Sequence, residues 1–404
     1  MENPKIRFKG FTKDWEQRKL IDYLEVSSEK NRDNRFTKDD VLSVSGEYGI
    51  VNQIEFQGRS FAGASVSNYG VVENGDVVYT KSPLKSNPYG IIKTNKGIPG
   101  IVSTLYAVYK PKEITDSKFV QIYFELDSRM NSYMHPLVNK GAKNDMKVSA
   151  ENALKGMVSF PKKDEQEMIS LYFSNLDHLI TLHQRKCEQT KNLKKYMLQK
   201  MFPQNGAKVP EIRFNGFTHD WEQRKLGDDL VSIHTGTNLL GSITNTGMPL
   251  IKMGNIQRGY FDTSKVEFLA ENEQPDKADI VNYGDFFFNT RNTLELVGKG
   301  ATWMKNSGEY AFNSNIARFE LRNLDTIFFN YLYNTDYMTK QIHARAMGTT
   351  SVAAIYPRTL DSVEYLAPCM KEQQKIGAYF KQLDHLITLH QRKCEQTKNL
   401  KKYM

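Results

Sequence analysis

The sequence predicts an α/β (α+β) protein in which two domains with small twisted sheets are separated by two long antiparallel helices. Three observations predict this class. A block of 22 residues occurs twice without a difference, at residues 176–197 and 383–404. A second block, at residues 6–20, returns at residues 212–226 with two substitutions. The segments between these blocks differ in sequence but share a texture of short β-branched and aromatic runs. The chain is therefore an internal pseudo-twofold repeat. The repeated blocks, which we call the frame, are kept, while the segments between them differ.

The length of 404 residues suits two domains of roughly 150 residues with connecting elements. Residues 203–210, which hold two prolines, an asparagine and a glycine, are the clearest boundary. We expect four parts in chain order: a first variable domain at 1–162, a central helix at 163–203, a second variable domain at 204–369 and a C-terminal helix at 370–404.

Within the variable domains, apolar runs between Gly, Asn and Pro predict strands. These runs are Asp76–Thr80, Ile101–Tyr109, Asp285–Asn289 and Ala317–Leu321.

Residues 164–202 lack Pro and Gly and place apolar residues three and four apart, which predicts a long amphipathic helix with Asp164 as its N-cap. Both copies begin with the pattern Pro-x-x-x-Glu-Gln-x-x-Ile, at Pro161 and at Pro368. Because the middle of the repeated block is polar around His183, we do not expect a leucine zipper. The apolar positions that pair the helices or dock a partner are Leu176, Leu179, Ile180, Leu193, Met197, Leu383, Leu386, Ile387 and Leu400.

The composition narrows the functional classes. Lys and Arg number 55 against 46 Asp and Glu, and the net charge of +9 favours a polyanionic partner such as nucleic acid. Three cysteines support neither a disulfide framework nor a zinc site. We find no leader segment and no long apolar run, so we expect a cytoplasmic protein without a membrane partner.

Motifs of catalysis are missing from the sequence. It holds no phosphate-binding GxxxxGK[ST] loop, no GxGxxG after a strand, no HExxH, no CxxC and no Asn-Pro-Pro-aromatic motif. His183 and Cys187 lie four apart on one helix face, but a polar face explains them better than a metal site. Glu295 near Arg291 is better explained as solvated surface than as an acid–base pair. We expect neither a catalytic residue nor a bound metal.

The order of these features resembles the specificity subunit of type I restriction-modification systems. Each variable domain follows a Trp-x-x-x-Lys-Leu block, at Trp15 and at Trp221, and precedes the Pro-x-x-x-Glu-Gln-x-x-Ile pattern and a repeated helix. The resemblance implies two target recognition domains, each reading half of a split site in double-stranded DNA. It also implies a coiled coil that sets the spacing and docks two methyltransferase (modification) subunits. One departure is that Leu198–Phe202 follow the first copy of the helical block and have no counterpart after Met404.

The resemblance further implies a non-catalytic chain that binds no cofactor directly. S-adenosylmethionine, ATP and Mg²⁺ are expected on the methyltransferase and the restriction/translocase subunits. A helix of roughly 35 residues is about 50 Å long, which would hold the two domains more than one duplex turn of ~34 Å apart.

Base reading needs Arg or Lys for guanine and Asn or Gln for adenine, and further Lys residues bind phosphate. In the first domain the candidates are Lys81, Lys85, Asn87, Lys93, Lys143, Asn144 and Lys147. In the second domain they are Asn289, Arg291, Asn292, Lys299, Lys305, Asn313, Asn315, Arg345, Thr349 and Thr350, the two threonines following a glycine that would suit a phosphate.

Two other classes stay open from the sequence. One is an atypical DNA methyltransferase or nuclease acting alone, which the missing motifs disfavour. The other is a coiled-coil RNA-binding scaffold, which is disfavoured because a scaffold would not need two different variable domains between nearly identical repeated blocks.

Overall fold

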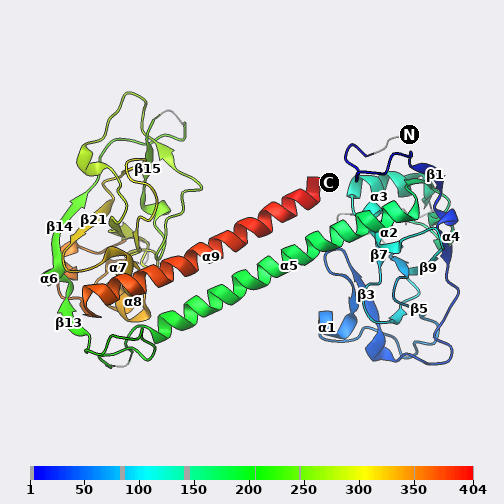
Figure 1. Ribbon diagram of the computed structural model, residues 1–404, viewed down its shortest axis with the longest axis horizontal. Coiled ribbons are helices and arrows are strands. Elements are labelled where there is room, and N and C mark those ends of the chain that lie inside the picture. The colour runs from blue at the N-terminus through cyan, green and yellow to red at the C-terminus, as the bar shows by residue number, and fades with distance from the viewer. Residues whose placement is uncertain are drawn as a thin grey trace. The chain divides into compact units, whose positions relative to one another are not determined.

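The computed structural model describes residues 4–81, 87–140, 146–204, 206–244, 247–349 and 351–403. The chain forms two compact units, each with its own sheets and core (Figure 1). Unit 1 holds residues 1–181 and 395–404, and unit 2 holds residues 182–394. This division differs from the four predicted parts, because each long helix is shared between the units instead of forming a part of its own.

Unit 1 is built on a four-stranded antiparallel sheet in the order β2-β9-β6-β7. Two-stranded pairs β1·β12, β3·β4, β5·β8 and β10·β11 surround it. The strands are β1 Glu16–Lys19, β2 Leu24–Val26, β3 Leu42–Ser45, β4 Gly49–Asn52, β5 Gly70–Val72, β6 Val77–Tyr79, β7 Ile92–Thr94, β8 Gly100–Val102, β9 Ala107–Pro111, β10 Asn139–Lys140, β11 Met146–Lys147 and β12 Met157–Phe160. The helices are α1 Gln53–Gln57, α2 Ser117–Phe124, α3 Asp127–Met134, α4 Ala150–Ala153 and the first part of α5 Lys163–Lys200.

Unit 2 repeats this plan with the antiparallel sheet β14-β21-β17-β19 and the pair β13·β24. It adds two three-stranded sheets, β16-β15-β20 and β18-β23-β22. The strands are β13 Glu222–Lys225, β14 Leu230–Thr235, β15 Pro249–Ile251, β16 Glu267–Phe268, β17 Phe286–Asn289, β18 Arg291–Asn292, β19 Gly300–Thr302, β20 Ala311–Phe312, β21 Ile316–Leu321, β22 Met347–Gly348, β23 Ala353–Ala354 and β24 Glu364–Ala367. The helices are α6 Leu226–Asp229, α7 Thr326–Tyr333, α8 Asp336–His343, the second part of α5 and the first part of α9 Met370–Tyr403.

In each unit the last strand of the four-stranded sheet is joined to a short helix, β7 to α2 and β19 to α7, by the same two hydrogen bonds. In unit 2 the Thr302 hydroxyl donates to the Thr326 carbonyl at 2.6 Å, and the Thr302 amide donates to Asn330 Oδ1 at 2.8 Å. In unit 1 Thr94 makes the equivalent bonds to Ser117 at 2.6 Å and to Gln121 at 3.0 Å. The frame is therefore repeated in its contacts as well as in its sequence.

The mixed α/β class with small sheets is as predicted, and three of the four predicted runs coincide with single strands, β6, β17 and β21. The run Ile101–Tyr109 is two strands instead, because the Tyr106 amide donates to the Ser103 carbonyl at 3.0 Å and turns the chain between β8 and β9. Asp164 is not the N-cap but lies within the first turn of α5, which begins at Lys163.

The two long helices run antiparallel where unit 2 brings them together. Lys194 Nζ of α5 bonds Asp384 Oδ1 of α9 at 2.5 Å, and His183 Nδ1 lies 3.2 Å from His390 Nδ1. Lys194 near the C-terminal end of α5 thus contacts Asp384 in the first half of α9, as in an antiparallel pair. In unit 1 the repeat-equivalent ion pair joins Lys401 Nζ to Asp177 Oδ1 at 2.7 Å.

Candidate nucleic-acid interface

The repeated Glu of α5 and α9 anchors the N-terminal block of each unit. Glu372 is fully buried and accepts from Arg213 Nε and Nη2, both at 2.7 Å. Glu165 accepts from Arg7 at 2.8 and 2.6 Å in the same bidentate way. Hydrogen bonding to the buried carboxylate raises the pKa of each arginine. This charge-assisted pair explains why Glu stands at this place in both copies.

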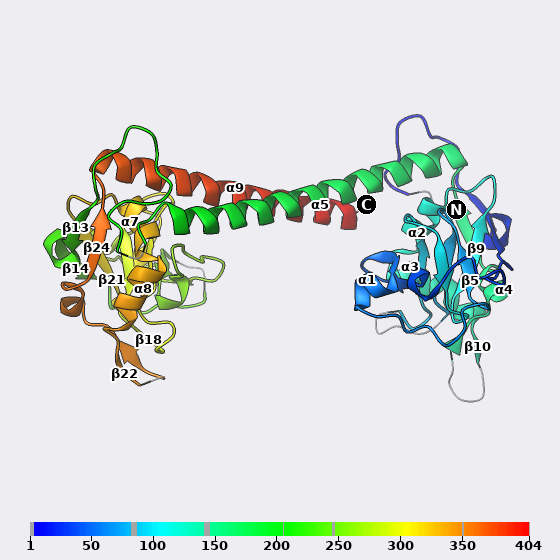
Figure 2. The same ribbon diagram turned by 90° about the horizontal axis from the view of Figure 1, so that it is seen from below.

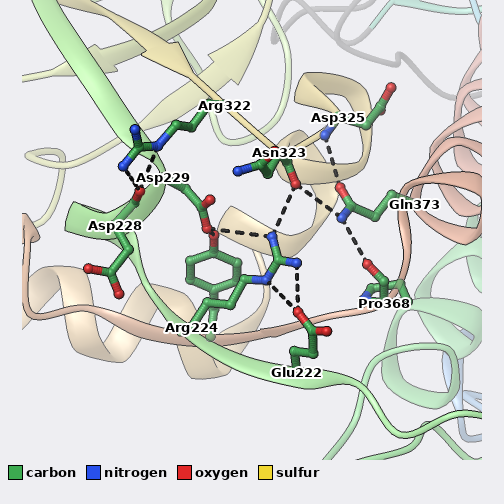
Figure 3. A network of polar contacts seen from close by, with 10 residues as sticks. Glu222, Arg224, Asp228, Asp229, Arg322, Asn323, Asp325, Pro368 and Gln373 are labelled. Atoms are coloured by element: carbon green, nitrogen blue, oxygen red, sulfur yellow. Dashed lines mark hydrogen bonds and ion pairs between the residues drawn. The ribbon is translucent and has the colours of Figure 1, made fainter.

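The Gln that follows this Glu positions a variable-domain helix. Gln373 Oε1 accepts from the Asp325 amide at 2.9 Å, and its Nε2 donates to the Pro368 carbonyl at 2.9 Å (Figure 3). Asp325 is itself the N-cap of α7. In unit 1 Gln166 makes the same two bonds, to Asp116 and Pro161. The Glu-Gln pattern is thus a structural clamp between frame and variable domain.

The polar network around Arg224 completes this clamp in unit 2. Arg224 donates to Glu222 Oε2 at 2.8 Å and to the Asn323 carbonyl at 3.2 Å (Figure 3). Asp229 accepts a short hydrogen bond from Tyr365, and burial followed by this bond raises the tyrosine pKa. These groups bind one another across β13, β24 and the loop before α7, so the network holds the sheet pair in place.

The small sheet β18-β23-β22 forms an outward face of unit 2. Arg291 lies opposite Ala354, and Ala354 lies opposite Met347, so the three residues form one row across the strands. Arg291 is exposed, and Met347 is 59% exposed. The neighbouring row places Ala353 in the core, which shows that the Arg291 row faces outward. Figure 2 shows β22 at the opposite end of the unit from the start of α9.

The turn of this hairpin requires a glycine. Gly348 has φ of +127°, and a Cβ there would lie 2.3 Å from the Val352 carbonyl oxygen. The Thr349 amide donates to that carbonyl at 2.9 Å, and Thr349 Oγ1 accepts from the Val352 amide at 3.2 Å. Thr349 therefore closes the turn, and Val352 is left 69% exposed.

Unit 1 carries a hairpin at the corresponding place in the chain, β10·β11, with Asn139 opposite Lys147 and Lys140 opposite Met146. Its residues are largely basic or polar, whereas the hairpin of unit 2 offers Met347 and Ala354. Ser82, Lys85, Gly141, Lys143, Asn144 and Thr350 lie outside the described residues.

Several predicted residues of unit 2 make bonds within the protein. Arg345 donates to the carbonyls of Thr359, Gln341 and Ser362 at 2.7–2.9 Å. Lys299 bonds Gln257, Lys305 bonds Thr263, Asn313 accepts from Asn315, and the buried Asn289 accepts from the Arg291 amide. Asn292 Oδ1 accepts from the Thr293 amide. A DNA role for these residues stays a prediction, and Arg291 has the freest side chain among them.

The described candidates of unit 1 are also engaged. Lys81 donates to the Thr104 carbonyl at 2.9 Å, and Asn87 is buried. Lys93 lies 3.4 Å from Glu125 and lines a polar cavity of about 540 Å³, whose wall includes Asp177 and Thr181 in the middle of α5.

Sequence reasoning missed the apolar members of the Arg291 row and the exposed Arg258. Arg258 bonds His343 at 2.9 Å, and the adjacent Gln257 accepts from Lys299, so this loop lies beside the segment after β18. Burial, then the charge of Arg258, lowers the pKa of His343. Met347 and Ala354 gave no signal, because apolar residues in a strand ordinarily indicate core.

The repeated helical block presents the same leucines twice. Leu176 and Leu383 are buried, whereas Leu179, Leu193, Leu386 and Leu400 are between 41% and 45% exposed. Ile180, Met197 and Ile387 are half-buried. Each unit therefore exposes two of these leucines in an identical sequence context.

No cluster of three or more His, Cys, Asp or Glu side chains suited to a metal occurs among the residues that the structure describes. Within the same residues, no helix is both long and apolar enough to cross a membrane.

Comparisons with known proteins agree on one family. The family described as type I restriction modification DNA specificity domain matches residues 218–399. The type I restriction enzyme MjaVIII specificity subunit of Methanocaldococcus jannaschii is 24% identical over 78% of this chain and 74% of its own length. The putative type I restriction enzyme MjaX specificity subunit of the same organism is 22% identical over 96% of this chain and 91% of its own.

A crystal structure of the type I restriction-modification system S subunit from M. genitalium shares the fold, with a TM-score of 0.55 at 12% identity over 100% of this chain and 97% of that one. The two hairpins, the clamps and the repeated helices thus occur in a chain whose relatives are specificity subunits. Residues 218–399 of this chain thus match the DNA specificity domain of type I restriction-modification systems, and the chain is similar over most of its length to specificity subunits of such systems.

Proposed function

We propose that this chain is the non-catalytic DNA-reading subunit of its complex, and that each unit reads one half of a bipartite, asymmetric site in double-stranded DNA. The observation that carries this proposal is the contrast between the two hairpins. Both hairpins stand at the same place in matched frames, yet the sequence of β10·β11 is Asn139, Lys140, Met146 and Lys147 while that of β22·β23 is Met347, Gly348, Ala353 and Ala354. Matched frames that carry hairpins of unlike sequence are what two different half-sites require.

The chemistry of the Arg291 row suits a base edge. An arginine can donate two hydrogen bonds to guanine, and apolar side chains contact the methyl group of thymine. A short β-ribbon is narrow enough to enter the major groove. We therefore assign base contacts to Arg291, Met347 and Val352, and we assign to Thr349 a contact with phosphate or base.

The other predicted DNA-binding residues of unit 2 are assigned to phosphate, because many of them already contact groups of the protein. Phosphate contacts fall to lysines that can exchange their partner in the protein for DNA, such as Lys299 and Lys305. In unit 1 we assign the equivalent contacts to the hairpin lysine Lys147 and to Lys85, Lys143 and Asn144. Unit 1 would then read its half-site with a more basic surface than unit 2.

The exposed leucines of the repeated block support docking of two copies of one partner. Leu179 and Leu400 belong to unit 1, Leu193 and Leu386 belong to unit 2, and the sequence around them is the same. We propose methyltransferase subunits as these partners, with restriction/translocase subunits joining the complex. S-adenosylmethionine, ATP and Mg²⁺ would bind those subunits and not this chain.

The test is a genome-wide map of methylated adenine in cells that express the methyltransferase partner with wild-type chain or with Arg291→Ala. Loss of a bidentate contact costs about 1–3 kcal/mol, so discrimination at one base pair of one half-site should relax roughly 5- to 150-fold. Lys225→Ala is the matched control, because it removes an exposed cation that both frames share. Relaxation of both half-sites together, or none with Arg291→Ala, would contradict the assignment.

A further inference from the structure

A tight turn at residues 257–260 of unit 2 is fixed to the core at both ends. Its first amide donates to its last carbonyl at 2.9 Å, and the flanking Ile256 and Phe261 pair as an antiparallel bridge. Ile256 belongs to a buried apolar cluster, and Phe261 packs against that cluster. Two residues of the turn itself, Arg258 and Tyr260, are exposed. The turn therefore presents an arginine and an aromatic ring at the surface from an anchored backbone.

The glycine of this turn ties it to the sheet and to α7. Gly259 has φ of +81°, a conformation that favours glycine. Its amide donates to the Gly300 carbonyl of β19 at 3.0 Å, and its carbonyl accepts from Asn330 Nδ2 at 3.0 Å. The buried Asn330 side chain, which also accepts from the Thr302 amide, thus holds the sheet and the turn together. A turn ordered in this way loses little conformational entropy when it binds a partner.

Arg258 connects the turn to both chain segments that lead to the Arg291 row. Its Nη2 lies 2.9 Å from His343 Nε2 and 3.5 Å from the Glu295 carbonyl oxygen. Glu295 follows Arg291 by four residues in the chain, and His343 precedes Met347 by four. The guanidinium therefore lies between the segment that follows β18 and the segment that precedes β22.

The partners of this guanidinium leave its charge uncompensated. Arginine has no acceptor, so His343 Nε2 accepts the hydrogen bond as part of a neutral imidazole. Burial, followed by the charge of Arg258, lowers the His343 pKa and favours this neutral form. Within the part of the chain that the structure describes, Arg258 forms no ion pair with a carboxylate, and the nearby Lys299 bonds the neutral Gln257 side chain at 2.7 Å. Two such cations favour an anionic partner.

The donors that remain on Arg258 suit phosphate better than guanine. Each of the two paired-donor edges of a guanidinium contains Nη2, and this Nη2 is already engaged by His343 and Glu295. Nε and Nη1 donate to no group among the described residues. A guanine contact with two hydrogen bonds needs a whole free edge, whereas a phosphate oxygen can accept from a single donor.

We propose that Arg258, held in place by His343, binds a DNA phosphate beside the bases that the Arg291 row contacts. His343 is a positioning residue, because it orients the guanidinium and leaves Nε and Nη1 free for the phosphate. This inference rests on the proposed function and adds to it a fixed backbone contact next to the reading hairpin of unit 2.

The experiment measures the Kd for DNA by fluorescence anisotropy at a series of salt concentrations, with the full chain bound to its methyltransferase partner. One labelled duplex carries the motif from the wild-type methylation map, and a second carries a scrambled sequence. A single phosphate contact contributes about 0.9 to the slope of log K against log salt, or roughly 8-fold in affinity between about 1 M and 0.1 M salt. We expect Arg258→Ala to weaken both duplexes by about this factor and to reduce the slope by about 0.9.

The matched control is Arg322→Ala. Arg322 is also an exposed arginine bonded to a carbonyl, that of Asp228 at 2.9 and 2.8 Å, but it lies in the clamp network of the frame (Figure 3). We expect this variant to keep the wild-type Kd and slope. Because Arg258 is exposed as well, its removal should leave the Tm near that of the wild type.

Two variants of His343 test its positioning role. His343→Ala leaves the arginine present but unheld, so the affinity for both duplexes should fall while the slope stays as in the wild type. His343→Gln supplies an amide oxygen that can accept from Arg258, so it should restore the wild-type affinity. A Gln variant as weak as the Ala variant would overturn the positioning role.

An unchanged Kd and slope for Arg258→Ala would overturn the phosphate contact, and so would a loss confined to the motif duplex. Arg291→Ala separates this failure from failure of the proposed function. If the wild type prefers the motif duplex and Arg291→Ala reduces that preference, the proposed function stands whatever Arg258→Ala does. A wild type without any preference for the motif would refute the proposed function and this inference with it.

Discussion

The buried pair of Arg213 and Glu372 predicts a large effect from a nearly isosteric change. Glu372→Gln keeps the shape of the side chain but removes its charge and turns an NH₂ group toward the guanidinium. Two hydrogen bonds of 2.7 Å are affected, and the Glu372 side chain is 1% exposed. The variant therefore loses at least one charge-assisted bond and leaves a buried cation without its counter-charge.

The magnitude follows from the burial of both partners. Breaking a buried ion pair costs about 3–5 kcal/mol. The Arg213 side chain is 14% exposed and keeps its bond to the His219 carbonyl, which places the expected loss near the lower end, at about 3 kcal/mol. For a unit of this size that loss lowers the Tm by roughly 6–12 °C.

The assay is urea unfolding followed by tryptophan fluorescence, with two matched variants. Glu165→Gln should produce a similar loss in unit 1, because its bonds to Arg7 repeat the geometry. Glu222→Gln breaks an ion pair whose carboxylate is 71% exposed, and it should cost less than about 1 kcal/mol. A Glu372→Gln protein within about 0.5 kcal/mol of wild type would refute the assignment of this pair as the clamp.

Three further predictions concern the turn, the helix pair and an inner arginine. Gly348→Ala places a Cβ 2.3 Å from the Val352 carbonyl, so the partner's methylation of sites that depend on reading by unit 2 should weaken while the Tm changes little; unchanged methylation would contradict this. Burial, followed by His390 and neighbouring lysines, lowers the pKa of His183, so the folded state binds this proton less tightly than the unfolded state. Stability is then lost as the pH falls below about 6.5, and His183→Gln should reduce the drop in Tm between neutral and acidic buffer. Arg345→Ala removes donors to three carbonyls and should lower the urea midpoint without DNA present, whereas a residue that contacts only DNA would leave it unchanged.

The sequence predicted those parts of the fold that depend on local periodicity and on the repeat. The long helix α5 runs from Lys163 to Lys200 and contains all but the last two residues of the predicted run 164–202, because nothing in this stretch interrupts helical spacing. Strand β17 was predicted from an unbroken aromatic run; Phe286 and Phe288 pack into one cluster and Phe287 into another, so both faces of the strand are buried. The β8–β9 turn was not predicted, since the residues between the strands carry no glycine or proline.

The candidate interface was harder to predict because residue type does not determine exposure. Asn289 and Asn313 have the chemistry for adenine, but their side chains satisfy nearby groups in the protein instead, as short amides often do. The type of residue at Met347 gave no reason to expect exposure, and only the pairing of β22 with β23 places it in a row with Arg291. Strand register, which the sequence alone did not supply, thus separates outward residues from buried ones.

The central claim is that the two units read DNA independently within one shared frame. The most direct measurement is the methylated-adenine map of cells in which residues 227–368 are replaced by the corresponding segment of another specificity subunit, with the same methyltransferase partner. We predict that one half of the bipartite motif changes and that the other half stays as in the wild type. A change in both halves, or a motif that does not depend on this chain, would contradict the claim.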